Sequence, residues 1–336
     1  MNLLKRYILP RLIQYFVVIF IGITIVFLVP RFTPLDPVVS VLNRMTSYGA
    51  QYLDPESLEK LRITMMELYG LKGGILEQYF KFWGRLFRGD FGPSLSIFPT
   101  PVISIIKNSL PWTAGLLIIA AFLSWSIGNI LGGLAGYYSE KKWAKALSIV
   151  AMSIYPIPYY IMALILIILF AYIFPFFPIV GGYSIGITPS FSLTFILNLI
   201  KHAFLPALAL IIVGIGWWFL SMRSLTSTVN AEDYVVYAEI MGIPRRKILF
   251  QYVMKNSMLP QITNLALQIG GIFSGSLVTE SVFSYPGLGQ VLYMAINNGD
   301  FNLMMGITVF SIVGISTTAL LIDLLYPLFD PRVRYR

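Results

Sequence analysis

The sequence predicts an all-α polytopic membrane protein with six transmembrane helices, and two observations support this fold class. First, 57% of the 336 residues are hydrophobic and only 12% are charged, whereas a soluble domain of this length needs more charged surface. Second, six uncharged runs are each long enough to cross about 30 Å of hydrocarbon as a helix. These runs are 12–29, 112–137, 146–174, 203–222, 262–279 and 303–322.

Residues 1–30 are expected to form an N-terminal cytoplasmic tip and the first span. Lys5, Arg6 and Arg11 precede the first apolar run, an arrangement that signal peptides share. We expect an uncleaved span instead, because the run is long and no small-residue cleavage site follows it.

Residues 31–107 form a long segment that is expected to be external and helical. Apolar residues at three- and four-residue steps predict a helix over 55–69, with Asp54 as its N-cap and Gly70 as its C-cap. A second, amphipathic helix rich in aromatic residues is expected over 75–87. Two interpretations remain open, a helical cap resting on the outer membrane surface and a docking platform for an external partner.

Residues 108–336 are expected to form a core domain with the other five spans. Pro156 and Pro158 lie in the third run, so its first part should bend, because proline interrupts the helical hydrogen-bond ladder. The six runs contain no ionisable side chain, which disfavours a membrane-embedded enzyme. The chain has no cysteine, which excludes disulfides, thiolate catalysis and cysteine-ligated metals.

The distribution of lysine and arginine predicts that both termini are cytoplasmic. The N-terminus, the second-to-third connection, the fourth-to-fifth connection and the tail together hold 14 of the 24 basic residues. The short connections on the other side hold only Lys201. The remaining basic residues lie in the long external segment, and long loops cross the membrane regardless of their charge.

The fourth-to-fifth connection, 224–260, is predicted to form a helix–turn–helix bracket in the cytoplasm. Acidic residues in the first turn suit the dipole of a helix over 231–241. Gly242 then supplies a left-handed C-cap, and Pro244 fits the first turn of a second helix.

The second helix of the bracket opens with Arg245, Arg246 and Lys247. Three cations at a helix N-terminus oppose the helix dipole, so a group outside the helix should compensate them. Lipid phosphates would serve an ordinary amphipathic interfacial element. An acidic groove on a partner protein is the alternative.

The bracket also carries a recognisable pattern. Tyr237-Ala238-Glu239, then Gly242, then 256–260 (Asn-Ser-Met-Leu-Pro) resemble the EAA loop of ABC importer permeases. Tyr237 stands where the first acidic residue is usual, and Glu239 stands where an alanine is usual. The spacing from Gly242 to Pro260 is longer than the general consensus and is similar to that of the dipeptide/oligopeptide/nickel (OppB/DppB-type) permeases.

Further blocks along the whole chain resemble the same family in the same order. They are 6–8 with 31–37, 89–94 with 101–102, 280–289 and 323–335. One departure is Leu35, which stands where glycine is common. The resemblance implies the type I ABC importer permease fold, with the external segment as a helical insertion after the first span.

The resemblance implies a non-catalytic permease subunit in the inner or plasma membrane that forms half of a translocation pathway for short peptides. Oligosaccharide or nickel import are alternatives within the family, and a stand-alone channel is a remote one. The implied partners are a homologous second permease, two ATPase subunits, an external substrate-binding protein and membrane lipid, but no nucleic acid. The chain has no GxxxxGK[ST] phosphate loop, so ATP and Mg²⁺ are expected on the ATPase subunits and no cofactor on this chain. The residues expected to couple to the ATPase are Tyr234, Tyr237, Ala238, Glu239, Gly242, Pro244, Arg245, Arg246, Asn256 and Pro260.

The fifth run is the expected wall of the pathway. Its polar residues lie at hydrocarbon depth, where they are unfavourable unless they face protein or a watery cavity. Gly271 and Gly275 form a small-xxx-small ridge for close helix contact, and helix packing alone is the alternative reading. The candidate pathway residues are Asn264, Gln268, Gly271, Ser274, Gly275 and Glu280.

Two acidic residues and two tryptophans complete the predictions. Glu280 follows the fifth run at the outer mouth, where it would gate or orient a cationic substrate end. Capping the helix or pairing with a neighbour in the partner permease are the alternatives. Asp300, in the last external turn, is a candidate contact for the binding protein. Trp217 and Trp218 lie in the middle of the fourth run, which predicts that both are buried against other helices.

Overall fold

The computed structural model describes residues 8–32, 55–68 and 70–329, and this part of the chain is helical without strands. The helices are α1 (Leu9–Phe32), α3 (Pro55–Leu68), α4 (Ile75–Phe87), α5 (Val102–Tyr137), α6 (Lys142–Ile154), α7 (Tyr159–Ile167), η3 (Ile168–Ile173), α8 (Leu193–Asn230), α9 (Asp233–Ile240), α10 (Arg245–Lys247), η4 (Ile248–Met254), α11 (Lys255–Gly270), η5 (Gly271–Ser274), α12 (Leu277–Val282), α13 (Leu288–Asn297) and α14 (Phe301–Phe329). The predicted all-α class is confirmed. The predicted N-cap Asp54, motif residues 33–37 and tail 330–336 lie outside the described residues.

Four helices of the described part, α1, α5, α8 and α14, are long and apolar enough to cross a membrane. A fifth candidate is the pair formed by α6 and α7 with η3, which bends by 95°. Pro158 is the N-cap of α7, so the bend lies where the two prolines predict it. Helix α3, in the segment expected to be external, also ends as predicted, because Gly70 has φ +66° and its N–H donates to Glu67 O at 3.1 Å.

The predicted fifth span, 262–279, is not one continuous helix. α11 begins earlier, at Lys255, and ends at Gly270. One 3₁₀ turn follows, then Gly275 with φ +70°, and then the short helix α12. The cause is local, because glycine disfavours helix by about 1 kcal/mol per residue and readily adopts positive φ.

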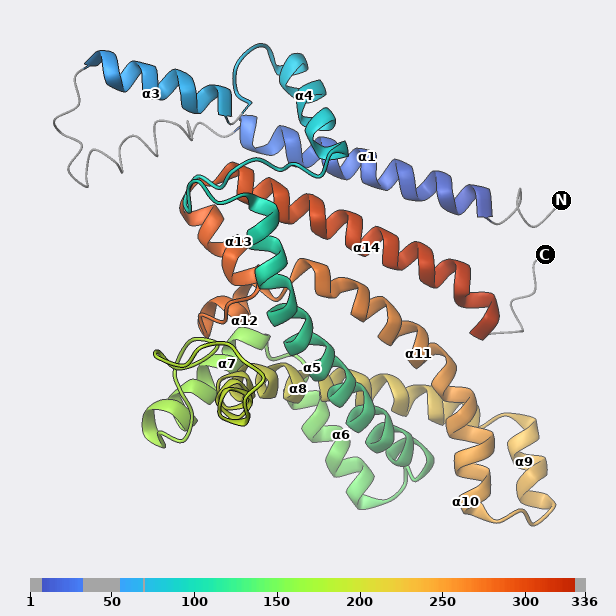
Figure 1. Cartoon of the computed structure of the whole chain (residues 1–336). Coiled ribbons are helices and arrows are strands. Elements are labelled where there is room, and N and C mark those ends of the chain that lie inside the picture. Colours follow the sequence, from blue (N-terminus) through green and yellow to red (C-terminus); the bar gives the residue numbers. More distant parts are fainter. Residues whose placement is uncertain (1–7, 33–54, 69, 330–336) are drawn as a thin grey trace.

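The centre of the bundle is the pair α5 and α8, while α1 packs beside α14 (Figure 1). Glycines at four-residue spacing on α5 let the two backbones approach closely. A Cβ on Gly132 would lie 2.4 Å from Phe219 O, and one on Gly136 would lie 2.7 Å from Arg223 O. Figure 1 places the start of α1, the end of α14 and helix α9 at one end of the bundle, and α3, α4 and α13 at the opposite end.

Candidate coupling bracket and translocation pathway

The first arm of the bracket, α9, ends in a Schellman motif. The N–H of Ile243 donates to Ala238 O at 3.1 Å, and the N–H of Gly242 donates to Glu239 O at 3.0 Å. These are the two hydrogen bonds that define the motif, and Gly242 has the required positive φ of +72°. The predicted C-cap is confirmed. The helix itself is shorter than the predicted 231–241, with Glu232 as its N-cap.

The second arm is continuous with the predicted pathway helix. Pro244 is the N-cap of α10 and so precedes the first turn in which it was predicted to lie. From Arg245 the chain stays helical through α10, η4 and α11 to Gly270. A helix of this length, roughly 40 Å at about 1.5 Å per residue, joins the tip of the bracket to the middle of the bundle.

The inner faces of the two arms pack against each other. Val235 and Ala238 on α9 are buried against Ile248 and Val253 on η4, and the ends of α5 and α8 cover the cluster with Tyr137 and Val229.

A hydrogen bond also joins the arms at their base. The amide of Asn256 donates to Tyr234 Oη at 3.0 Å and to Tyr252 O at 2.6 Å. Three of the predicted coupling residues, Tyr234, Ala238 and Asn256, therefore hold the bracket together.

The outer face of the bracket is an unusual surface, because apolar side chains lie exposed beside cations. We call Tyr237, Ile240 and Met241 the apolar tip; they are 66%, 75% and 79% exposed. Arg245 and Arg246 are exposed next to it and make no ion pair with a described residue. Glu239 and Pro260 are also exposed. Such a surface fits a partner that offers both an apolar recess and negative charge.

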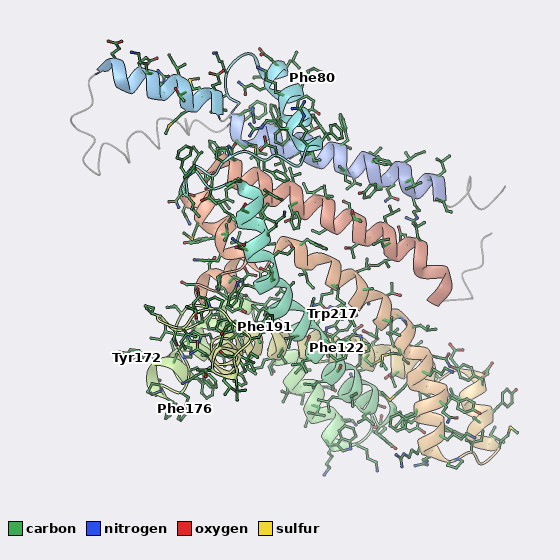
Figure 2. All side chains as sticks on the ribbon, viewed as in Figure 1. Phe80, Phe122, Tyr172, Phe176, Phe191 and Trp217 are labelled. Atoms are coloured by element: carbon green, nitrogen blue, oxygen red, sulfur yellow. The ribbon has the colours of Figure 1, made fainter. Side chains whose placement is uncertain are left out.

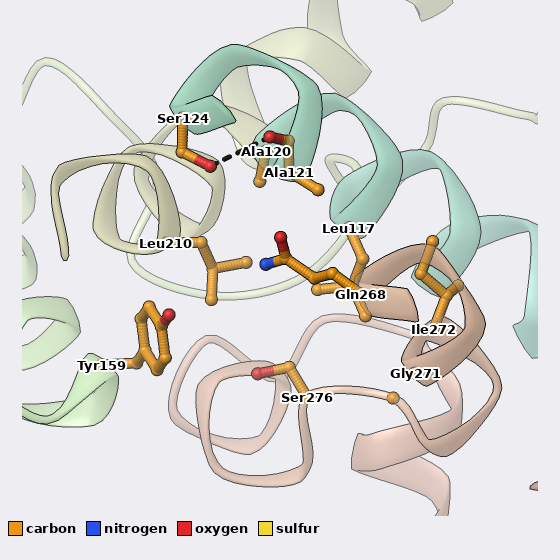
Figure 3. Close-up of a pocket in the computed structure, with 11 residues that line it drawn as sticks. Leu117, Ala120, Ala121, Ser124, Tyr159, Leu210, Gln268, Gly271, Ile272 and Ser276 are labelled. Atoms are coloured by element: carbon orange, nitrogen blue, oxygen red, sulfur yellow. Dashed lines mark hydrogen bonds between the residues drawn. The ribbon is translucent and has the colours of Figure 1, made fainter. Parts of the chain in front are cut away.

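Two cavities lie along α11, and they share two residues. The cavity farther from the bracket, here the distal cavity, has a volume of about 310 Å³. The proximal cavity, nearer the bracket, has about 290 Å³. Tyr159 and Gln268 line both. Figure 3 shows the Gln268 side chain extending into the distal cavity toward Leu210, with Tyr159 and Ser276 around the same space.

Four predicted pathway residues line these cavities. Gln268, Gly271 and Gly275 line the distal cavity, and Asn264 lines the proximal one with Gln268. Ser274 lines neither, because its exposed hydroxyl donates to Gly271 O at 2.7 Å.

Several other residues line the cavities without having been predicted to, and Tyr159 is the one that both cavities share. The preceding Pro158 marks the break that brings this ring to the cavities. Trp217 lines the proximal cavity and is 39% exposed, so only Trp218, at 1%, is buried as predicted.

The prediction that Glu280 lies at the open outer mouth of the pathway is wrong, because its carboxylate is buried and hydrogen-bonded to the start of α13. The residue is fully buried, and its Oε2 accepts hydrogen bonds from the N–H groups of Gly289 at 2.7 Å and Gln290 at 3.3 Å. Those groups belong to the first turn of α13, which leaves its donors without intrahelical partners. Oε1 accepts from Thr113 Oγ1 at 3.0 Å and from Ser276 N at 3.2 Å. Glu280 therefore caps α13 and ties it to α5.

The prediction that Asp300 contacts the binding protein is also wrong, because this carboxylate is buried and hydrogen-bonded within the chain. It is fully buried, and its Oδ2 accepts from Ser94 Oγ at 2.5 Å and from Ser96 N and Oγ at 2.9 and 2.7 Å. Its Oδ1 accepts from Leu303 N at 3.0 Å in the first turn of α14. Asp300 fixes the loop before α5 to the start of α14 and has no surface left for an external protein.

Comparison with known proteins gives a consistent result. Residues 128–335 match the family described as binding-protein-dependent transport system inner membrane component. The oligopeptide transport system permease protein OppB of Escherichia coli K12 is 29% identical over 330 residues, covering 98% of this chain and 99% of the relative. AppB of Bacillus subtilis, with the same description, is 30% identical over 318 residues, covering 94% and 96%.

A probable peptide ABC transporter permease of Sinorhizobium fredii is 29% identical over 332 residues. The match covers 98% of this chain and 99% of the relative. These similarities extend over the apolar helices, the bracket and the external helices alike. The chain therefore belongs to the binding-protein-dependent inner-membrane transport components, as an OppB/DppB-type permease subunit of an ABC importer.

Proposed function

We propose that this permease imports short peptides, forms half of their pathway and transmits ATPase motion through the bracket. The observation that carries the proposal is the unbroken helix from Arg245 to Gly270, which connects the exposed tip to both cavities. The names of the relatives favour peptides over the oligosaccharides and nickel that the sequence left open.

The proposed orientation puts the bracket and both termini in the cytoplasm. The basic connections support it, as does the position of the start of α1 and the end of α14 at the same end of the bundle as α9.

The partners we propose are a homologous second permease, two ATPase subunits that bind ATP and Mg²⁺, and an external binding protein. The surface formed by the apolar tip, Arg245 and Arg246 supports the ATPase assignment, because it needs an apolar recess lined with acidic groups.

The mechanism we propose is a lever. Closure of the ATPases on ATP moves the apolar tip, and the helix from Arg245 to Gly270 carries that motion to the cavities. Beyond Gly270 the chain changes direction at Gly275, and Glu280 holds the next helices to α5. The break between Gly270 and Gly275 thus separates a helix that moves from a region that stays fixed.

The cavities suit a peptide because their polar groups are neutral. Gln268 and Asn264 present amides, which can both donate to and accept from a peptide backbone. Neither side chain, nor the hydroxyl of Tyr159, has a hydrogen-bond partner among the described residues. Polar groups at this depth without a partner indicate a wet or solute-filled space. Tyr159 and Gln268 line both cavities, and in this proposal they form the constriction between them.

Uptake by the complete transporter in lipid vesicles tests this proposal. We expect Gln268→Leu to lower ATP-driven uptake of a labelled tripeptide about tenfold, because a peptide passing the constriction loses about one hydrogen bond worth about 1 kcal/mol or more. Gln268→Asn, the matched control, keeps the amide and should retain most uptake. ATP hydrolysis stimulated by the binding protein should be unchanged in both. Full uptake by Gln268→Leu, or competition by an oligosaccharide instead of a peptide, would contradict the proposal.

A further inference from the structure

Helix α4 divides into an apolar face and a basic face. Leu76, Tyr79, Phe80, Trp83 and Phe87 recur at three-, four- and one-residue steps that gather on one side of the helix. The opposite side carries Glu77, Lys81, Arg85 and Arg88.

Contacts show where α4 crosses α1. The ring of Trp83 stacks on Phe20 with centroids 5.8 Å apart, and Phe82 lies 5.5 Å from Phe27. The hydroxyls of Thr24 and Tyr79 share a hydrogen bond of 2.8 Å. Arg31 Nε, near the end of α1, donates to Gln78 Oε1 at 3.1 Å. α4 therefore lies against residues 20–31 of α1.

This crossing point is at the depth of the hydrocarbon. α1 is a candidate membrane span that ends at Phe32, and Phe20 is roughly 18 Å before that end at about 1.5 Å per residue. The hydrocarbon core is about 30 Å thick. Phe16 and Phe20 are 64% and 54% exposed, as expected for side chains that face lipid. The stacked ring of Trp83 lies at the same level.

Three large apolar side chains of α4 are left uncovered by the described part of the chain. We call Leu76, Phe80 and Phe87 the α4 stripe; they are 74%, 71% and 83% exposed. Figure 2 shows Phe80 at the periphery of the molecule. The ring of Phe87 lies 5.6 Å from Trp83. The stripe thus continues the lipid-facing surface of α1.

We infer that α4 lies in the plane of the membrane leaflet opposite the bracket, with its stripe in phospholipid acyl chains and its basic face at the phosphates. An apolar face immersed beside a basic face is the arrangement of interfacial helices. Lys81 pairs with Glu77 at 2.6 Å and Arg85 with Asp90 at 3.2 Å, so part of the charge on the polar face is neutralised within the chain. The stripe borders Trp83, whose ring stacks on Phe20 inside the span, and this continuity with α1 favours lipid over a soluble partner.

The absence of cysteine makes a direct test possible. Phe80→Cys and its matched control Lys81→Cys are adjacent in the sequence and lie about 100° apart around the helix, so the first is on the stripe and the second on the basic face. Both positions are exposed. Each variant is labelled with a nitroxide in the full-length permease, reconstituted in phosphatidylethanolamine–phosphatidylglycerol bilayers. Collisions with oxygen, which dissolves in acyl chains, are compared with collisions with a water-soluble nickel chelate. Phe16→Cys in α1 calibrates a lipid-facing site.

We expect oxygen collisions at position 80 to exceed nickel collisions several-fold, as at position 16, and the reverse at position 81. Leu76→Cys repeats the measurement if the first variant does not fold. Nickel collisions at position 80 as frequent as at 81 would overturn the inference. So would nickel accessibility at position 80 that falls only when the external binding protein is added, because that result assigns the stripe to a protein. No uptake is measured, so the outcome does not depend on the proposed transport function.

Discussion

The bracket and α4 expose the same chemical pattern at opposite ends of the molecule. In both, large apolar side chains lie uncovered beside arginine or lysine. They differ in what lies next to them. The α4 stripe continues the lipid-facing side of α1, whereas the apolar tip extends past the ends of α5 and α8. Position along the spans, and not composition, therefore decides whether such a surface meets lipid or protein.

The two regions also differ in how they are attached to the bundle. The region that we propose to be external is fixed by buried charge: Asp300 accepts four hydrogen bonds from two segments. The bracket is attached mainly through the small apolar cluster around Val235 and Ile248. The first arrangement resists displacement, while the second permits a lever to move.

The largest expected effect is on the affinity for the ATPase subunits, and it distinguishes the apolar tip from the α4 stripe. We expect Ile240→Asp with Met241→Asp to weaken binding of purified ATPase subunits about 100-fold, because two charges would enter an apolar recess. Leu76→Asp with Phe80→Asp changes the α4 stripe in the same way and should leave that affinity unchanged. The measurement is the affinity of the ATPase subunits for each double variant in nanodiscs. Equal losses from both pairs would remove the distinction between a protein surface and a lipid surface.

A smaller effect is expected from the turn of the bracket. A Cβ at position 242 meets no atom within 4 Å, so Gly242→Val acts through its backbone alone. Holding a non-glycine residue at φ +72° costs about 1–2 kcal/mol, or roughly 5- to 30-fold in the population of the native bracket.

We expect Gly242→Val to reduce ATP-driven uptake in vesicles by about that factor while the permease still inserts. Asparagine tolerates the left-handed region, so Gly242→Asn should keep most of the activity. Two variants with the same uptake would show that the turn is not under this constraint. Gly115→Ala, within α5 and with open space around it, is a second control.

Apolar runs predict most of this fold, because hydrocarbon demands long uncharged helices whatever their neighbours are. The failure is in the fifth run. Gly270, Gly271 and Gly275 are uncharged, so hydropathy continues across them, although the helix ends at the first of these glycines. An uncharged run reports the solvent that surrounds a segment and not the conformation of its backbone.

The candidate site also contains residues that local sequence predicts and residues that it does not. The turn at Gly242 was predictable because its hydrogen bonds join residues at most five positions apart. Glu280 and Asp300 were misplaced because some of the donors that hold them are remote in sequence, although Gly289, Gln290 and Leu303 lie within ten positions. Thr113 lies 167 residues from Glu280, and Ser94 lies 206 residues from Asp300. A carboxylate beside a helix start fits a surface contact and a buried cap equally well until the fold brings the donors together.

The smallest expected effect on ATPase binding, none at all, belongs to the variant that tests how the loop before α5 is attached to α14. Asp300→Ala leaves the N–H groups of Ser96 and Leu303 without an acceptor, and each unpaired buried group costs about 1–3 kcal/mol. We expect a thermal aggregation midpoint several degrees lower in detergent, with unchanged ATPase binding. Asp300→Asn retains one acceptor oxygen, so its aggregation midpoint should lie between those of Asp300→Ala and the parent protein. Loss of ATPase binding in Asp300→Ala would show that the external region and the bracket are mechanically linked. An unchanged midpoint would show that the loop before α5 does not depend on this carboxylate, and the contrast between a fixed end and a movable end would then rest on the bracket alone.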